Sequence, residues 1–329
     1  MRILARLQPV FALAALIALS GCSHGGPLSA APMQAQSHAR FAVGNTPMGS
    51  FYACPAKGPI EYVADANHNI INIYSGRFAG QAACGAFAAQ LHSPLGLYMQ
   101  SSTHDLYVAN EVVGTVLVFH RGGTIPYNVY SELGYTPTDV AVAADGTLIA
   151  ANYNCTLSTW IVGSNGGTPV GNFAMPNCNR GFAFLTAKRD GTIYYANNGS
   201  FPTRGTLWSV ACPAGVCGTP SKVAGVRLGI DSAGLAIDST GDVSAVRLSR
   251  GGRDNRAFTF ELPNPKPQAF PLLPGQPLGL AINPLDHHFF VTDFGFNTAT
   301  EYSYPDGHVV GSVVGEPNNG FPSGIAVDP

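Results

Sequence analysis

The stretch Pro277-Leu278-Gly279-Leu280-Ala281-Ile282-Asn283 recurs, in altered form, along most of this chain. A polar turn follows it, then Phe289-Phe290-Val291-Thr292-Asp293, and then an alternating segment at residues 301–304. Short apolar runs bounded by turn residues, followed by an alternation of period two, are typical of successive β-strands. The unit therefore predicts an apolar strand, a tight turn, a second apolar strand that ends on a carboxylate, and an alternating third strand.

Six copies of the first strand align on one position, which is usually glycine and which we call the marker position. It is occupied by Gly96, Asp139, Gly181, Gly234, Gly279 and Gly324. Successive copies are 43, 42, 53, 45 and 45 residues apart. A period near 45 residues with several short strands is typical of the four-stranded blade of a β-propeller. The sequence thus predicts an all-β fold, a six-bladed β-propeller of four-stranded blades.

The two ends of the repeat array complement each other. The second strand that ends at Asp65 has no first strand before it, and the first strand that contains Gly324 has no second strand after it. Pairing the two closes the ring and removes an open sheet edge, which would otherwise invite aggregation. We therefore expect Pro329 to lie beside residues 58–61, in a propeller that spans residues 51–329.

The first residues have the layout of an export signal. Arg2 and Arg6 precede an apolar run at residues 10–19, which is too short to span a membrane. The run ends in Leu19-Ser20-Gly21-Cys22, which resembles the lipobox of bacterial lipoproteins. The resemblance implies that residues 1–21 are removed and that Cys22 carries several acyl chains, enough for a stable membrane anchor. The alternative is an ordinary signal peptide with an incidental cysteine.

The segment after Cys22 indicates where the protein is located, and the overall charge indicates which partners it can bind. Residues 22–50 are rich in Gly, Ala, Pro, Gln and Ser, which predicts a flexible tether. Ser23 after the cysteine resembles the sorting pattern of outer-membrane lipoproteins, on the periplasmic or surface face. Charged residues make up 11% of the chain and the net charge is −2, so no basic patch for nucleic acid is expected. We expect a monomer.

The chain has seven cysteines. Besides Cys22, an even number remains, and in an exported protein this predicts disulfides, although spacing alone leaves fifteen pairings open. The spacings do not resemble a zinc site. The pairs that we expect are Cys54–Cys84, Cys155–Cys178 and Cys212–Cys217.

The repeat motif resembles known families. The pattern Pro-x-Gly-Leu-Ala-Ile-Asp, then Tyr-Val-Ala-Asp/Asn, then an alternating strand is similar to NHL-type and related six-bladed propellers, including the SMP-30-like and virginiamycin-B-lyase-like proteins. The resemblance covers about residues 58–329. It implies the fold, and in the lactonases and lyases a divalent ion held by carboxylates, Asn or His at the channel mouth. One propeller architecture hosts hydrolases, lyases and binding modules, so the motif does not fix the function.

Candidate site residues follow from the repeat. The last residue of each second strand is expected near the central channel, and Asp139 replaces the usual small residue at the marker position. Arg247 is suited to an anionic group or to a salt bridge. Asn and Asp also belong at turns for their local hydrogen bonds, which is the competing interpretation. The candidate ligand-binding residues are Asp65, Asn110, Asp139, Asn152, Asn197, Arg247 and Asp293.

Three functions remain in view, of which the third is an assembly component whose propeller is only structural. The first is a binding module for a protein, peptide or glycan partner, which needs no cofactor. The second is a metal-dependent lactonase or lyase with one divalent cation such as Ca²⁺, held by Asp139 and Asp293, that polarises a carbonyl. No glutamate occupies the ring of strand ends, so the ligand set of the SMP-30-like enzymes is not reproduced. We expect a binding module, and no catalytic residue is assigned.

Overall fold

A computed structural model describes residues 51–329 of this chain, apart from residues 56, 79, 132–133, 165, 168, 179–180, 182, 198–204, 229–230, 250–254, 263–266, 274, 284–286 and 315–319. The expected signal, the expected acylation site Cys22 and the predicted tether lie outside the described residues.

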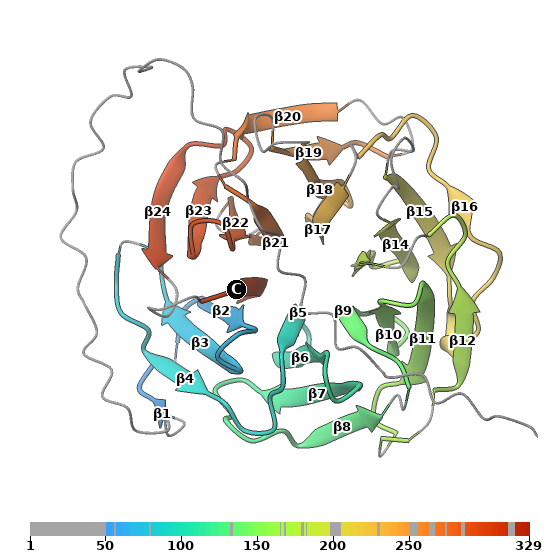
Figure 1. Cartoon of the computed structure of the whole chain (residues 1–329), viewed down its shortest axis with the longest axis horizontal. Helices are drawn as coiled ribbons and strands as arrows, with labels where there is room; N and C mark the ends of the chain where they lie inside the picture. The colour runs from blue at the N-terminus through green and yellow to red at the C-terminus, as the bar shows by residue number, and fades with distance from the viewer. Residues whose placement is uncertain are drawn as a thin grey trace, which may run out of the picture. The chain divides into compact units, whose positions relative to one another are not determined.

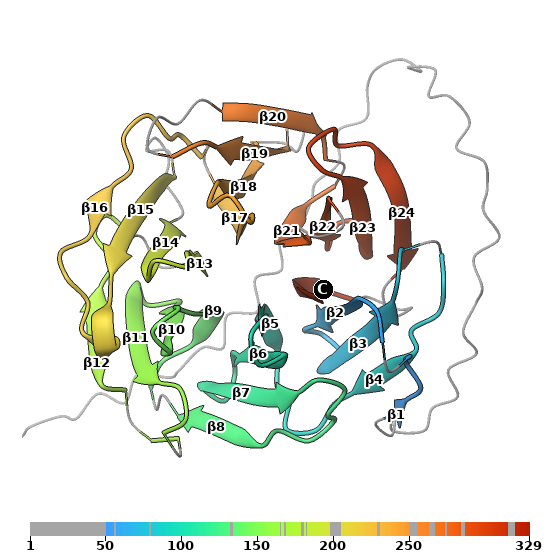
Figure 2. The same ribbon diagram turned by 180° about the vertical axis from the view of Figure 1, so that it is seen from behind.

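The described residues form six antiparallel sheets arranged around a common centre (Figure 1). The view from behind shows the same ring of blades (Figure 2). Each blade has four strands in sequence order from the centre outward, except the first, which takes its innermost strand from the end of the chain and adds a fifth strand outside. The predicted six-bladed β-propeller is therefore confirmed.

The strands are grouped here by their place in the blade. The innermost are β25 (Pro322–Asp328), β5 (Pro94–Gln100), β9 (Pro137–Val142), β13 (Phe184–Ala187), β17 (Asp231–Ile237) and β21 (Pro277–Asn283). The second are β2 (Ile60–Asp65), β6 (Asp105–Asn110), β10 (Thr147–Asn152), β14 (Thr192–Asn197), β18 (Val243–Leu248) and β22 (His288–Asp293). The third are β3 (Ile70–Ser75), β7 (Thr115–His120), β11 (Thr156–Ile161), β15 (Thr206–Ala211), β19 (Arg256–Phe260) and β23 (Thr298–Ser303). The outermost are β4 (Gly85–Phe87), β8 (Asn128–Ser131), β12 (Gly171–Ala174), β16 (Ser221–Lys222), β20 (Pro267–Leu272) and β24 (Val309–Val314). The short β1 (Phe51–Tyr52) pairs outside β4, and a 3-10 turn, η1 (Pro213–Gly215), precedes β16.

The core lies between neighbouring blades. All six residues of β6 and of β10 are buried, because each second strand is covered on both faces by adjacent blades. This explains why the second strands are apolar runs with little alternation. Between the second and third blades, Tyr107 packs in one cluster with Leu148 and Trp160, and Tyr130 contacts Trp160 at 6.0 Å between ring centroids.

The ring closes as the sequence predicts. In β25, Asp328 pairs with Ile60 and Val327 pairs with Glu61 of β2, so the end of the chain lies beside residues 58–61. The C-terminus is accordingly found near the centre of the ring (Figure 1). All seven residues of β25 are buried, so the closing strand is an integral part of the first blade.

The marker glycines allow the innermost strands to approach one another. A Cβ atom on Gly324 would overlap the backbone of Leu95 and Leu97 in β5, and one on Gly279 would lie 2.6 Å from the carbonyl oxygen of Ser323 in β25. Glycine recurs in the repeat because backbones of adjacent blades meet at this position and leave no room for a side chain.

The alignment of the fourth blade needs a correction. The sequence repeat places Gly181 at its marker position, but Gly181 precedes β13. Leu185 pairs with Tyr195, as Leu280 pairs with Val291, so the residue that occupies the marker position is Phe184. Residues 181–184 have the sequence Gly-Phe-Ala-Phe. Sequence similarity aligns the glycine with the marker position, whereas strand pairing places the second phenylalanine there.

Three disulfides join the expected cysteines, Cys54–Cys84, Cys155–Cys178 and Cys212–Cys217. The Cys212–Cys217 bond encloses η1, inside the insertion that lengthens one step of the repeat. Three disulfides indicate an extracytoplasmic protein. Within the part of the chain that the structure describes, no helix has the length and apolar character needed to cross a membrane.

Candidate functional site

A cavity of about 510 Å³ occupies the centre of the propeller and is walled by the six innermost strands. Leu95, Thr138 and Ser323 line one end, and they are at most 4% exposed. Ser101, Arg189 and Ser239 line the opposite end and are exposed, because they belong to hairpins between first and second strands. As judged from the described lining residues, the cavity thus has a buried floor and an open hairpin mouth.

The wall between floor and mouth is mainly apolar. Leucine, isoleucine and methionine side chains from several different blades contribute to it. They include Leu97, Met99, Leu185, Leu235, Ile237, Leu280, Ile282 and Ile325. A pocket of this size with an apolar wall and a few polar groups is typical of small-molecule sites.

Asp139 provides the carboxylate at the floor. Its Oδ1 accepts a hydrogen bond from the Val140 N–H at 2.9 Å, and its Oδ2 accepts one from the Leu185 N–H in β13 at 2.8 Å. Gly96 of β5 lies directly against it, so Asp139 touches both neighbouring innermost strands. Burial raises the pKa of Asp139 to about 7, although the two N–H donors act in the opposite direction.

This pKa predicts a pH-dependent stability. The ordinary pKa is 3.8, so between about pH 4 and pH 7 the folded state holds a proton that the unfolded state has released. The unfolding free energy should therefore fall as the pH rises through this window, by about 1.4 kcal/mol for each pH unit, and level off above pH 7. Denaturant titrations at pH 5 and pH 8 measure the fall, and Asp139→Asn should reduce it. Equal falls in the two proteins would contradict the prediction.

The hairpin mouth contains polar side chains that the repeat analysis did not single out. His104 places its Nδ1 at 2.5 Å from Oδ1 of Asp328, which is completely buried and also pairs with Arg121. Asp238 accepts hydrogen bonds within its own turn and from the Tyr304 hydroxyl at 2.8 Å. A signal for His104 existed in the sequence, because the equivalent hairpin position is glycine in the next three blades (Gly146, Gly191 and Gly241), although the last blade also has a histidine there, His287.

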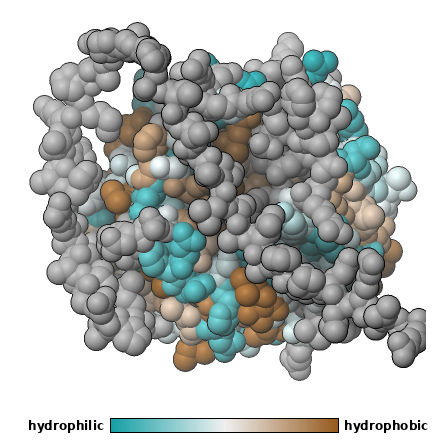
Figure 3. All heavy atoms as spheres, viewed as in Figure 1, coloured by the Kyte–Doolittle hydropathy of each residue, from teal (hydrophilic) through white to brown (hydrophobic). Residues whose placement is uncertain are grey.

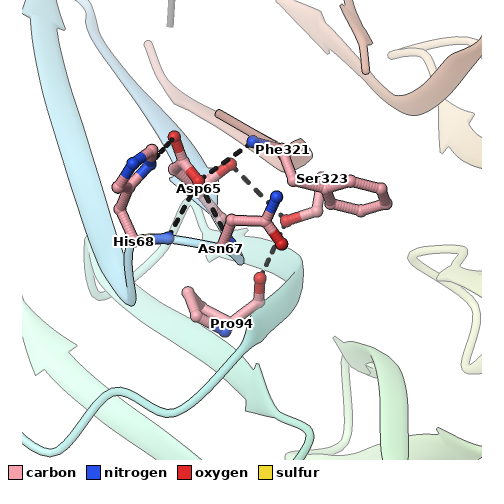
Figure 4. A network of polar contacts seen from close by, with 7 residues as sticks. Asp65, Asn67, His68, Pro94, Phe321 and Ser323 are labelled. Atoms are coloured by element: carbon pink, nitrogen blue, oxygen red, sulfur yellow. Dashed lines mark hydrogen bonds and ion pairs between the residues drawn. The ribbon is translucent and has the colours of Figure 1, made fainter. Parts of the chain in front are cut away.

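The predicted strand-end residues lie away from this cavity. Asp65 accepts hydrogen bonds from the backbone N–H groups of Asn67, His68 and Phe321, and its second oxygen contacts His68 Nδ1 at 3.0 Å (Figure 4). In the same network the Ser323 hydroxyl donates to the carbonyl of Pro94 at 2.8 Å and joins two innermost strands. Asp65 thus holds the turn after β2 against the segment that enters β25.

Asn110 and Asp293 do the same in their blades. The side-chain oxygen of Asn110 accepts from the His92 N–H at 2.6 Å, and Oδ1 of Asp293 accepts from the N–H groups of Gln276 and Phe296. Burial raises the pKa of Asp293, while these N–H donors lower it. Such bonds are the turn chemistry that Asn and Asp commonly provide.

The remaining strand-end residues are Asn152, Arg247 and Asn197, and their side-chain contacts differ. Asn152 donates to the hydroxyls of Thr156 and Ser158 at 3.2 and 3.1 Å. The guanidinium of Arg247 lies 4.7 Å from the centre of the Phe258 ring, a cation–π geometry. Asn197 ends β14, and its side chain is outside the described set. Of the predicted ligand-binding residues, the structure therefore places Asp139 at the cavity, and the ligand role of the others stays a prediction.

The fit to a divalent cation is poor in the described residues. Asp139 and Asp293 do not share a site, because Asp293 does not line the cavity. No group of three or more His, Cys, Asp or Glu side chains in the described ranges is placed to hold a metal ion. The metal role of Asp139 and Asp293 stays a prediction that metal analysis of the protein can test.

The turns that follow the second strands expose apolar side chains. Val112 is 74% exposed and Phe296 is 60% exposed, whereas the neighbouring Phe294 stacks on Phe321. Figure 3 shows small hydrophilic and hydrophobic patches side by side among the coloured residues of one face. Apolar residues scattered in this way are normal for a protein surface.

Comparison with known proteins identifies the fold and not the family. No family model matches the sequence, and no curated protein matches it. A chain of a nidogen/laminin complex superposes with a TM-score of 0.63 at 12% identity, covering 83% of this chain and 99% of the other. Kuenenia stuttgartiensis hydrazine synthase gives 0.56 at 13% identity, covering 74% and 72% of the two chains. A luciferin-regenerating enzyme gives 0.51 at 13% identity, covering 69% and 77%. These likenesses support the six-bladed propeller alone.

Proposed function

We propose that this chain is an exported, lipid-anchored binding module that holds a small ligand in its central cavity. The observation that carries the proposal is the cavity of about 510 Å³, with an apolar wall, a buried floor and one carboxylate at that floor. Small-molecule sites usually combine a preformed concave wall with a few polar groups that orient the ligand. A rigid ring of strands supplies such a wall.

Export and anchoring rest on the sequence together with the disulfides. The apolar run before Cys22 supports removal of residues 1–21, and the resemblance of residues 19–22 to a lipobox supports acylation of Cys22, which would attach the chain to the outer membrane. Three disulfides fit a domain that works outside the cytoplasm. The predicted tether, residues 22–50, would hold the propeller away from the lipid surface.

The geometry favours binding over a metal-dependent lactonase or lyase. Both oxygens of Asp139 accept backbone hydrogen bonds, and among the described lining residues the other carboxylate, Asp238, lies at the opposite end and is bonded within its own hairpin. The described residues therefore offer an orienting acceptor at the floor, which suits recognition of a ligand.

Filling the cavity tests the proposal. Ile282 is half-buried and lines the cavity, so Ile282→Trp should obstruct it, whereas Val314→Trp on the exposed outer strand β24 should not. A fragment library is screened by thermal shift with the disulfide-intact protein. We expect hits that stabilise the wild type and Val314→Trp but not Ile282→Trp, by about 2.7 kcal/mol at one hundred times the dissociation constant. Hits that act equally on all three proteins, or no hits, would contradict a cavity ligand.

A further inference from the structure

His104 holds an unusual backbone conformation at the hairpin mouth. Its φ is +58°, in the left-handed region that L-residues seldom adopt. The equivalent hairpin residues of the next three blades are Gly146, Gly191 and Gly241, with φ values of +82°, +86° and +91°. Glycine adopts this conformation without strain, and the last blade has a second histidine, His287, at the same place (φ +53°), so the role of the His104 imidazole has to be read from its own contacts.

The imidazole is oriented by a buried carboxylate. Its Nδ1 lies 2.5 Å from Asp328 Oδ1, and the side chain of His104 is 47% exposed while that of Asp328 is completely buried. Arg121 pairs with the other oxygen of Asp328. Because a carboxylate only accepts hydrogen bonds, Nδ1 is the protonated nitrogen, and Nε2 of the neutral ring is left as an acceptor.

A second acceptor stands at the far end of the same cavity. Gly96 of β5 lies against Asp139 at the floor, and four residues later the strand ends at Gln100, whose carbonyl accepts the His104 N–H at 2.8 Å. At about 3.3 Å per residue, roughly 13 Å separates the two levels. The wall between them is mainly apolar, so the cavity has an acceptor at each end and an apolar passage between, and its mouth also carries Arg189 and Asp238.

We propose that the ligand of this cavity is an elongated, mainly apolar molecule with a hydrogen-bond donor, an amine or a hydroxyl, at each end. One donor meets Asp139 at the floor, and the other meets Nε2 of His104 at the mouth. The inference rests on the proposed function, because it names the chemical class that the cavity would select. It makes His104 a residue that determines specificity and contacts the ligand.

Three probes of equal chain length test the ligand class by calorimetry at pH 8, above the pKa of about 7 of Asp139, and at concentrations below micelle formation. Decamethylenediamine has a donor at each end, decylamine has one donor, and sebacic acid has two carboxylates. We expect the diamine to bind about five- to tenfold more tightly than decylamine, the gain of one hydrogen bond, and sebacic acid not to bind. Equal affinities for diamine and decylamine, or preferred binding of sebacic acid, would overturn the inference.

Two matched variants locate the mouth contact. His104→Gly should fold, since glycine suits this turn and Asp328 keeps Arg121 as its partner. His287 has the same conformation (φ +53°) in the last blade and does not line the cavity, so His287→Gly is the control. We expect His104→Gly to lower diamine affinity to that of decylamine, and His287→Gly to leave both unchanged. Thermal unfolding of each variant shows that it is folded.

The outcomes separate the inference from the proposed function. If the three probes fail while library fragments still bind the wild type and not Ile282→Trp, the cavity binds ligands and the donor-ended class is wrong. If probes and fragments both fail, the proposed function itself is wrong. If the diamine loses affinity equally in His104→Gly and His287→Gly, the effect is one of turn structure, and the role of His104 is refuted.

Discussion

Removing residues 322–329 is expected to abolish the folded propeller. Their strand, β25, is buried along its whole length, pairs with β2 and lies between the innermost strands of the second and sixth blades. Its loss exposes a strand edge and opens the ring, at a cost that reaches the whole stability of an ordinary domain, about 5–15 kcal/mol. Near-ultraviolet circular dichroism and limited proteolysis measure the loss of packing.

Two controls make this deletion specific. Removing Pro329 alone leaves every residue of β25 in place and should change little. A synthetic peptide of residues 322–329, added to the truncated chain, should restore protection from proteolysis, and a scrambled peptide should not. A truncated chain that unfolds at the temperature of the intact protein would show that β25 does not close the ring.

The substitution Gly324→Ala is expected to lower the unfolding free energy by about 3 kcal/mol, because the new methyl group overlaps backbone atoms of Leu95 and Leu97 that cannot move aside. Gly324 does not have a positive φ, so the effect is steric. Gly218 is the matched control: its nearest neighbour is the Ala211 carbonyl oxygen at 3.7 Å, and Gly218→Ala should stay within about 0.5 kcal/mol. Denaturant titration measures both. Equal effects of the two substitutions would refute the close approach of the blades.

The repeat predicts the architecture because the same packing constraints act on a short stretch of sequence in successive blades. Marker glycines such as Gly279 and Gly324 lie where a neighbouring innermost strand leaves no room for a side chain, and second strands such as β6 are buried along their whole length and mainly apolar between their end residues. Phe184 escapes detection because a large residue fills the place of a small one, and strand pairing rather than similarity reveals it.

The site is less predictable from the sequence. Asp139 stands out because a carboxylate interrupts a row of small residues. The strand-end residues do occupy equivalent positions in their blades, but the sequence does not say that the cavity opens at the hairpins on the opposite side. The end at which the cavity opens depends on how the six innermost strands converge, which is a property of the three-dimensional structure. The contact between His104 and Asp328 joins residues 224 positions apart, and no local pattern encodes it.

The Cys54–Cys84 bond also has a mechanical consequence. If the N-terminal side is held at a membrane, a force on the domain is transmitted along the chain to Cys54. The disulfide then transmits it directly to Cys84 in the outer part of the first blade. The segment between them, which contains β2 and β3, is bypassed by the load. Resistance to forced unfolding is set by the rate of the first rupture. With the Cys54–Cys84 bond intact, tension cannot detach β2 from the closing strand β25. Once the bond is reduced, tension acts on β2 directly and can detach it.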